Sequence, residues 1–136
     1  MIYVTRKERF NAAHKMWKDE WTVEKNQEIF GKCANINWHG HNYELFVTVK
    51  GELKETGYVV DLKLLSSLLK DEVIEKLDHK NLNLDVDFMK GKITSTENLT
   101  LSIWNIIEPK IKNELNCILH CVKLYETENN FVEYYG

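Results

Sequence analysis

The segment from His39 to Lys50 alternates between two kinds of side chain along most of its length. Four of its odd-numbered positions are aromatic or aliphatic: Tyr43, Leu45, Val47 and Val49. A period of two residues is typical of a β-strand with one buried face, whereas a helix repeats about every 3.6 residues. The alternation therefore predicts a long strand whose apolar face must be covered by other parts of the chain.

Two histidines, His39 and His41, begin this strand and lie on its apolar face. Residues two apart on a strand are roughly 6.5–7 Å apart at Cα, so both imidazoles can reach one metal ion at about 2.0–2.1 Å. A third histidine, His14, ends an extension of the first strand, where Phe10, Ala12 and His14 share a face. If the two strands pair antiparallel, the three histidines meet at one end of the sheet. Three neutral nitrogen ligands leave a fourth position open, as catalytic zinc requires.

The loop before the histidine pair carries Cys33, six residues ahead of His39. A thiol beside a metal site is a candidate base or nucleophile. Plainer interpretations exist, because a His-x-His pair is often simply packed or solvated and a cysteine is often an inert buried thiol. His14 and the polar surroundings of Cys33 favour the metal site.

Length and composition bound the class of protein. At 136 residues with 43% hydrophobic side chains, the chain is expected to form a single domain, residues 1–136. Its 18 basic and 21 acidic side chains give a formal charge of −3, which argues against nucleic acid or an anionic membrane as a partner. No apolar run approaches the roughly 20 residues that span a bilayer, and Met1–Thr5 resembles a strand rather than a secretory leader. Three cysteines, an odd number, suit a reducing compartment, so a cytoplasmic location is expected.

Strand patterns occur at four places: about Ile2–Phe10, His39–Leu53, Cys117–Glu126 and Phe131–Tyr135. The last two flank Asn129-Asn130, a natural turn pair. Cys117 and Cys121 should share a face of the third strand, where we expect both to be buried. With two helices between the second and third strands, the order ββααββ predicts an α+β fold. We expect this fold to consist of a four-stranded antiparallel sheet with two helices packed on one face.

The first of these helices is expected to follow an N-cap at Asp61 and to end near Asp78. Its apolar stripe consists of Leu62, Leu65, Leu69, Val73 and Leu77. The second helix opens at Thr94-Ser-Thr-Glu97, which matches a capping box, and Pro109 should kink or break it. A short helix is also expected at Val23–Phe30, before Gly31.

The outer strands of so small a sheet would leave edges rich in Val, Tyr and Phe without a partner. Exposed strand edges of this kind pair readily with a second copy of the chain. A homo-oligomer is therefore expected.

Five motifs follow one another along the chain: Phe10-Asn-Ala-Ala-His14, the run FGKCANINWHGHNY from Phe30 to Tyr43, Leu77-Asp-His-Lys-Asn-Leu82, Thr94-Ser-Thr-Glu-Asn98 and Tyr125-Glu-Thr-Glu-Asn-Asn130. Together they resemble the 6-pyruvoyl-tetrahydropterin synthase family, which also includes the bacterial 6-carboxy-tetrahydropterin synthases of queuosine biosynthesis. The resemblance covers essentially the whole chain. It implies the tunnelling fold, in which subunits close into a barrel, usually as hexamers with active sites at subunit interfaces.

The resemblance further implies a zinc-dependent lyase that converts 7,8-dihydroneopterin triphosphate to 6-pyruvoyl-tetrahydropterin and eliminates triphosphate. His14, His39 and His41 match the family's zinc ligands, and Cys33 matches the thiol that accepts a proton. Zinc bound to the side-chain oxygens of the substrate would make the carbon-bound protons beside them more acidic.

Four more residues match the family's site. Asp78 and His79 match the relay that tunes the thiol, since a cationic neighbour stabilises a thiolate. Glu126 matches the carboxylate that anchors the pterin ring through two parallel hydrogen bonds, and it is sometimes counted in the relay. Glu97 matches a second carboxylate that contacts the pterin. Asp78-His79 also fits a plain helix end, and Glu97 also fits the last position of a capping box.

Two alternatives to the pyruvoyl-type lyase stay open. A 6-carboxy-5,6,7,8-tetrahydropterin synthase of queuosine biosynthesis would use the same substrate, although the five residues between Cys33 and His39 resemble the pyruvoyl type more closely. A non-catalytic zinc- or pterin-binding protein would keep the fold but would not need Cys33. Ile36 and Trp38 stand where family members often carry Pro and Gly, so the loop before the histidine pair is expected to be stiffened differently or to narrow the pocket.

Overall fold

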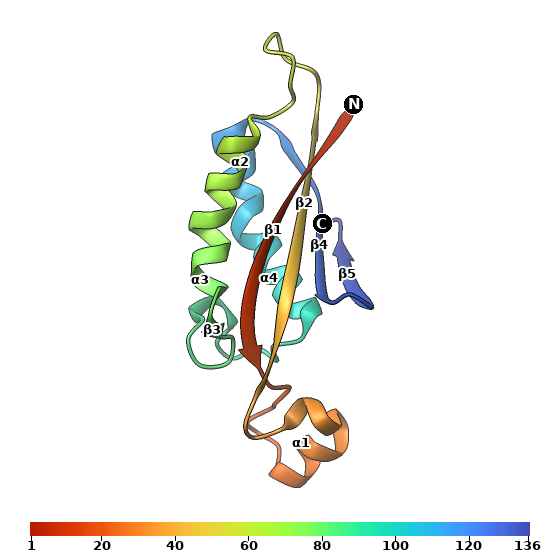
Figure 1. Ribbon diagram of the computed structural model, residues 1–136, viewed down its shortest axis with the longest axis vertical. Helices are drawn as coiled ribbons and strands as arrows, with labels where there is room; N and C mark the ends of the chain where they lie inside the picture. Colours follow the sequence, from red (N-terminus) through yellow and green to blue (C-terminus); the bar gives the residue numbers. More distant parts are fainter.

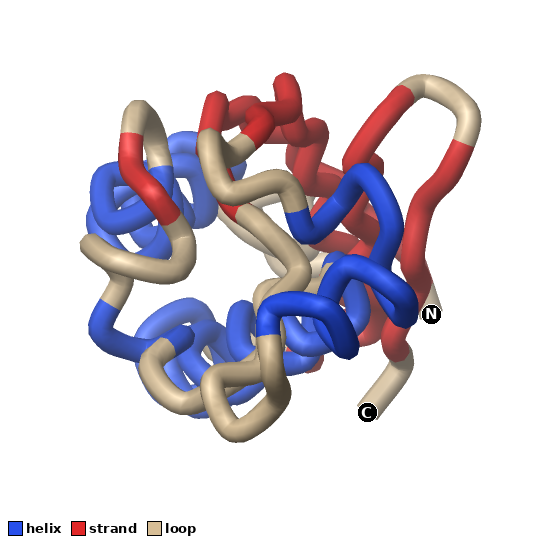
Figure 2. The backbone as a smooth tube through the Cα atoms, turned by 90° about the horizontal axis from the view of Figure 1, so that it is seen from below, coloured by secondary structure: helices blue, strands red, loops and turns tan.

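The computed structural model describes residues 1–136, and its centre is a five-stranded sheet in the order β3-β1-β2-β4-β5. The strands are β1 (Ile2–His14), β2 (His39–Gly51), β3 (Lys80–Asn81), β4 (Ile118–Thr127) and β5 (Asn130–Tyr134). Figure 1 shows the long helices on one face of the sheet, and in Figure 2 most of the strands lie at the top and right, with the long helices to the left and below. The α+β class and the helices on one face are confirmed.

The predicted number of strands was wrong. A fifth strand, β3, has two residues and runs parallel to β1 at Ala12 and Ala13. A strand this short contains no alternation from which it can be recognised. The remaining pairs, β1 with β2, β2 with β4 and β4 with β5, are antiparallel as predicted.

β1 and β2 form the longest ladder of the sheet. Each has 13 residues, and they pair from Ile2 opposite Gly51 to His14 opposite His39. The apolar positions of β2 all face the helices and are no more than 1% exposed: Tyr43, Leu45, Val47 and Val49. They belong to a core of 24 buried residues between the sheet and the helices.

One continuous helical stretch crosses the sheet in three parts: α2 (Leu62–Leu69), a π-helical turn (Lys70–Ile74) and α3 (Glu75–Leu77). The carboxylate of Asp61 caps it by accepting the backbone N–H of Lys63 at 2.8 Å. The stretch ends at Asp78, as predicted. The predicted apolar stripe is buried apart from Leu62, which is 43% exposed.

The last long helix, α4 (Thr96–Lys110), has a different cap from the one predicted. Ser95 is its N-cap, and the Ser95 hydroxyl accepts the backbone N–H of Asn98 at 3.2 Å. Thr94 therefore lies outside the helix, and Glu97 does not occupy the last position of a capping box. The capping explanation for Glu97 is thereby removed.

The proline of α4 does not break the helix. Pro109 is its penultimate residue, and the chain continues into a π-helical turn, Ile111–Leu115. A proline this close to the end removes one donor from a turn whose hydrogen bonding is already changing. The short helix α1 (Val23–Phe30) was predicted correctly, and Gly31 ends it with a positive φ of 56°. None of the helices combines the length and apolar character that crossing a bilayer requires.

A β-bulge interrupts the pairing of β4 with β2 between Leu119 and Cys121. The extra residue, His120, reverses the alternation of faces. Cys117 consequently joins the core cluster, whereas Cys121 does not belong to it. The expectation that both cysteines share a face was therefore wrong, although both are buried.

We expect Ser95→Ala to lower the free energy of unfolding by about 1 kcal/mol, because α4 loses the acceptor for an N-terminal amide. Glu97→Ala is the matched control, and it should cost only roughly 0.3–0.5 kcal/mol through the helix dipole. Urea unfolding measures both values. An equal loss from Glu97→Ala would indicate that a capping box forms after all.

Candidate functional site

The pairing of β1 with β2 gathers three histidines at the end of the sheet nearest α1 (Figure 1). One ring nitrogen each from His14, His39 and His41 lies within 4.8 Å of the other two. The ring centroids are 4.6 Å apart for His14 and His39, 5.1 Å for His14 and His41, and 5.0 Å for His39 and His41. The meeting predicted from strand alternation is thus present.

The nitrogens that face one another have no hydrogen-bond partner in the protein. His14 Nε2, His39 Nδ1 and His41 Nε2 are all buried and accept or donate no hydrogen bond. A buried polar atom without a partner costs roughly 1–3 kcal/mol, so three together call for a ligand. Neutral imidazole nitrogens are common zinc ligands, so an ion bound among the three would supply the missing partners. The three imidazoles fit a metal ion with one position open.

The backbone fixes the tautomer of His14. Its Nδ1 lies 2.7 Å from the carbonyl oxygen of Thr94. Because a carbonyl only accepts, Nδ1 carries the proton, and the lone pair of Nε2 is left for a metal ion. Burial lowers the pKa of His14 despite the opposing hydrogen bond to Thr94, and burial also lowers the pKa of His41. Neutral imidazoles of this kind are the form that binds metal.

A cavity of about 300 Å³ adjoins this cluster, and we call it the histidine cavity. Its lining includes His14 and His39 together with Cys33, Glu97 and Glu126. The volume is at the lower end of the range for small-molecule sites, about 300–1,000 Å³. Residues from four distant parts of the sequence thus border one space.

Cys33 reaches this cavity from a single turn of 3₁₀-helix, Gly31–Ala34. Its side chain is solvent-accessible, and its carbonyl oxygen accepts the backbone N–H of Met16 at 2.7 Å. This bond ties the cysteine loop to the segment that follows His14. The thiol is therefore held beside the metal-competent nitrogens rather than buried in the core.

Glu126 comes from the far end of β4. Its Oε1 lies 3.5 Å from His41 Nε2, and its Oε2 accepts a hydrogen bond from the Thr96 hydroxyl. Thr96 was missed by the sequence analysis, which treated it only as part of a helix start. No sequence signal separates a hydroxyl that orients a carboxylate from one that begins a helix.

Asp78 and His79 form an ion pair of 3.0 Å between Oδ2 and Nδ1. The other carboxylate oxygen of Asp78 accepts the backbone N–H of Asn11 at 2.8 Å. This backbone bond, with help from His79, lowers the pKa of Asp78. His79 adopts a positive φ of 59°, and its side chain is 82% exposed.

The Asp78–His79 pair does not border the histidine cavity. Asp78 instead lines a second cavity of about 630 Å³ with His41 and Glu126, and Cys33 is not part of its wall. Glu126 is the predicted residue that borders both cavities. Within one chain, the structure therefore does not bring the proposed relay to Cys33.

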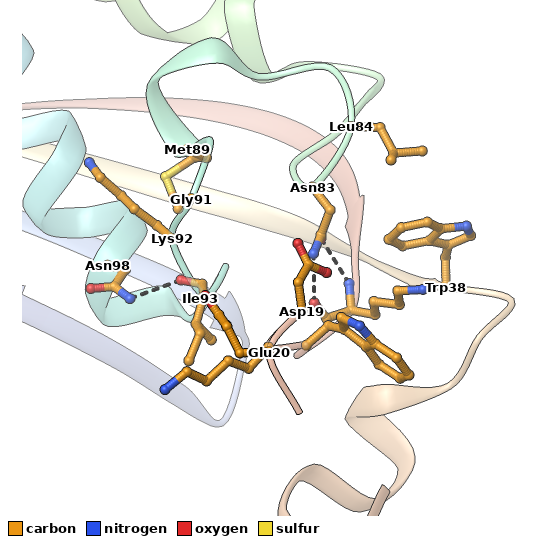
Figure 3. Close-up of a pocket in the computed structure, with 13 residues that line it drawn as sticks. Asp19, Glu20, Trp38, Asn83, Leu84, Met89, Gly91, Lys92, Ile93 and Asn98 are labelled. Atoms are coloured by element: carbon orange, nitrogen blue, oxygen red, sulfur yellow. Dashed lines mark hydrogen bonds between the residues drawn. The ribbon is translucent and has the colours of Figure 1, made fainter. Parts of the chain in front are cut away.

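A third cavity, also about 630 Å³, contains none of the predicted site residues (Figure 3). The Lys15 ammonium lies there, 4.6 Å from the Trp17 ring and 4.2 Å from the Trp38 ring. The Asn83 side chain accepts from the Lys15 N–H at 3.1 Å and donates to its carbonyl at 3.0 Å. The hydrogen bonds to Asn83 hold the backbone of Lys15, next to His14, in place. The Trp38 ring contacts the Lys15 ammonium.

The unusual residues of the loop lie away from the histidine cavity. Trp38, at a positive φ of 69°, lines the third cavity, and Ile36 is 56% exposed. Neither residue is part of the wall of the histidine cavity. Within one chain they therefore do not narrow the histidine cavity, and different stiffening of the loop stays a prediction.

Comparison with known proteins extends these observations. A family model described as 6-pyruvoyl tetrahydropterin synthase matches residues 3–136. The 6-pyruvoyl tetrahydrobiopterin synthase of Dictyostelium discoideum is 46% identical over 136 residues, which cover 99% of this chain and 96% of that protein. The solved structure of Caenorhabditis elegans 6-pyruvoyl tetrahydropterin synthase superimposes with a TM-score of 0.91 at 34% identity, covering 99% of this chain and 95% of that one. The 6-carboxy-5,6,7,8-tetrahydropterin synthase of Rickettsia bellii (strain RML369-C) is 30% identical over 150 residues, covering 98% of this chain and 99% of that protein.

The chelator-treated protein should lose stability as the pH falls below about 6.5. Burial lowers the pKa of His14 and His41 in the folded chain, whereas the unfolded chain keeps values near 6.5. Below that pH the unfolded chain binds protons that the folded chain does not, so the free energy of unfolding decreases until the folded-state pKa values are passed. Urea unfolding at several pH values between about 5 and 8 measures the slope.

His14→Asn is the control for this experiment, because asparagine does not titrate. Its pH dependence should be shallower than that of the parent chain. An unchanged slope in this variant would assign the pH dependence to groups other than His14.

Proposed function

Because the chain belongs to the 6-pyruvoyl tetrahydropterin synthase family, we propose that it is a zinc-dependent lyase that converts 7,8-dihydroneopterin triphosphate to 6-pyruvoyl-tetrahydropterin with elimination of triphosphate. The observation behind this proposal is the histidine cavity, which borders metal-competent histidines, one thiol and two carboxylates. A metal-binding module would have use for the histidines alone. A lyase also needs a base and a means of holding its substrate.

His14, His39 and His41 would hold the zinc ion. Zinc supplies Lewis-acid polarisation of the substrate's side-chain oxygens, which makes the neighbouring carbon-bound protons more acidic. Support for this assignment comes from their buried nitrogens without protein partners. The Thr94 carbonyl adds support, since it presents the deprotonated nitrogen of His14 to the cluster.

Cys33 would accept the carbon-bound proton. Its side chain is accessible from the cavity, and the Met16 N–H holds its loop beside His14. All three cysteines of the chain are unpaired. A reducing compartment such as the cytoplasm would keep Cys33 reduced, so that its thiolate could accept the proton.

The two carboxylates would bind the pterin ring. Glu126 can accept two parallel hydrogen bonds from an amino-pyrimidine edge, and the Thr96 hydroxyl orients this carboxylate by donating to Oε2. Glu97 borders the same cavity from the first turn of α4 and has no capping duty there. Both residues are therefore available to a ligand.

Asp78 and His79 would tune the thiol from a second copy of the chain. Neither residue borders the histidine cavity of its own chain, and Asp78 lines a different one, so the relay needs a neighbouring copy to complete it. The sheet offers edges for such an assembly, because β1 pairs with β3 only at Ala12 and Ala13 and β5 ends the sheet. We propose a homo-oligomer, a hexamer by family resemblance, with sites between subunits.

Cys33→Ala should reduce turnover of 7,8-dihydroneopterin triphosphate by about 10²–10⁴-fold, the usual loss when a general base is removed. Release of triphosphate by the zinc-loaded protein measures the rate. Cys121→Ala is the control, because this cysteine lies outside the histidine cavity. Undiminished turnover in Cys33→Ala would remove Cys33 as the base.

Mass analysis of the same reaction identifies the product. A pyruvoyl side chain is expected, in line with the higher identity to the Dictyostelium discoideum protein than to the Rickettsia bellii protein. A carboxy side chain would favour the 6-carboxy-5,6,7,8-tetrahydropterin synthase of queuosine biosynthesis. Binding of zinc and pterin with no turnover would favour a non-catalytic binding protein.

Mixing two inactive variants tests whether the site is shared between copies. Cys33→Ala and His79→Ala should each be nearly inactive alone, yet mixed oligomers should regain part of the activity. Some interfaces would then combine an intact Cys33 with an intact His79. The mixture is prepared by joint unfolding and refolding, and no recovery in demonstrably mixed oligomers would place both residues in one chain's site.

A further inference from the structure

Four buried polar side-chain atoms have no hydrogen-bond partner, and they all belong to the first strand pair: His14 Nε2, His39 Nδ1, His41 Nε2 and Tyr43 Oη. A metal ion accounts for the three imidazole nitrogens. It does not account for the tyrosine hydroxyl. A phenylalanine would fill the same space without leaving a buried donor unpaired, so the hydroxyl of Tyr43 calls for its own explanation.

The ring of Tyr43 is firmly placed. It is 1% exposed and stacks on Phe10 with centroids 4.8 Å apart and planes 10° apart. It also makes T-shaped contacts with two imidazole rings, with centroid distances of 5.6 Å to His41 and 6.4 Å to His14. The hydroxyl is buried and Tyr43 lines the second cavity, so a partner would reach the hydroxyl from that cavity.

The surroundings indicate what that partner is. Glu126 lines this second cavity as well as the histidine cavity, yet its carboxylate forms no hydrogen bond with Tyr43. The hydroxyl therefore remains a donor. Glu126 Oε2 is already bonded to Thr96, and Oε1 lies 3.5 Å from His41 Nε2. Tyr43 is thus a neighbour of both the carboxylate assigned to the pterin ring and the histidines assigned to zinc.

A pterin that is bound by Glu126 through its ring and by zinc at the histidines has its own side chain between these two places. In the proposed substrate this side chain is a hydroxylated three-carbon unit, which is rich in hydrogen-bond acceptors. We propose that the Tyr43 hydroxyl donates a hydrogen bond to an oxygen of that side chain, which makes Tyr43 a substrate-binding residue. This inference rests on the proposed function and adds to it a contact that selects pterins with a hydroxylated side chain.

The test compares two stable ligands on the zinc-loaded protein. Neopterin carries a trihydroxypropyl side chain, and pterin has none. Tyr43→Phe should raise the Kd for neopterin by roughly tenfold, the effect of about one lost hydrogen bond, and should leave the Kd for pterin unchanged. Quenching of ligand fluorescence measures both constants. Tyr125→Phe, the same change on the opposite face of the sheet, should alter neither.

Unfolding of the ligand-free variant provides the second readout. Removal of an unpaired buried hydroxyl should leave the thermal midpoint of Tyr43→Phe unchanged or raise it. A lower midpoint together with equal weakening of both ligands would overturn the proposal in favour of a structural role. Unchanged neopterin binding, or no binding of either ligand by the parent, would also overturn it.

The outcome is separable from that of the proposed function. A parent protein that binds neopterin through Tyr43 but does not release triphosphate would support the tyrosine contact and reject the lyase. A parent protein that turns the substrate over while Tyr43→Phe binds neopterin normally would do the reverse.

Discussion

The register between β1 and β2 is the constraint on which the site depends. His14 lies opposite His39 because the ladder is in phase over 13 residues of each strand. A slip of one residue would turn every side chain of a strand to the other face of the sheet. Such a slip would expose the apolar positions of β2, which are no more than 1% exposed: Tyr43, Leu45, Val47 and Val49. The burial of the hydrophobic core thus decides where the three imidazoles meet.

The sequence predicts those parts of the structure that have a periodic pattern of apolar side chains. The alternation of β2 predicts that His39 and His41 share a face, and the extension of β1 adds His14. The cysteine loop is different, because no periodic pattern brings Cys33 to the end of a strand. The position of Cys33, six residues before His39, suggested that meeting, and the likeness to a known family supported it. Asp78 shows a further limit, because the family resemblance links it to Cys33 although the two residues line different cavities of one chain.

The remaining errors have local causes. Thr94 and Ser95 are equally good N-caps by composition, and only the backbone decides between them. No pattern in the sequence of β4 announces the bulge at His120. Alternation counted across the bulge therefore assigns Cys117 and Cys121 to the same face, which is incorrect. Burial is also easier to predict than partnership. The alternation predicts that Tyr43 is buried, but it does not reveal that the Tyr43 hydroxyl has no hydrogen-bond partner.

The hydrogen bond from His14 to the Thr94 carbonyl has a wider consequence. Thr94 leads directly into α4, so one histidine joins the prospective metal site to the start of a core helix. An ion that binds only the folded chain adds RT ln(1 + [L]/Kd) to its stability, about 2.7 kcal/mol when the ion is present at 100 times its Kd. Metal supply would then govern how much folded protein a cell retains, as well as how fast each copy works. A shortage of the ion would then lower the amount of folded protein.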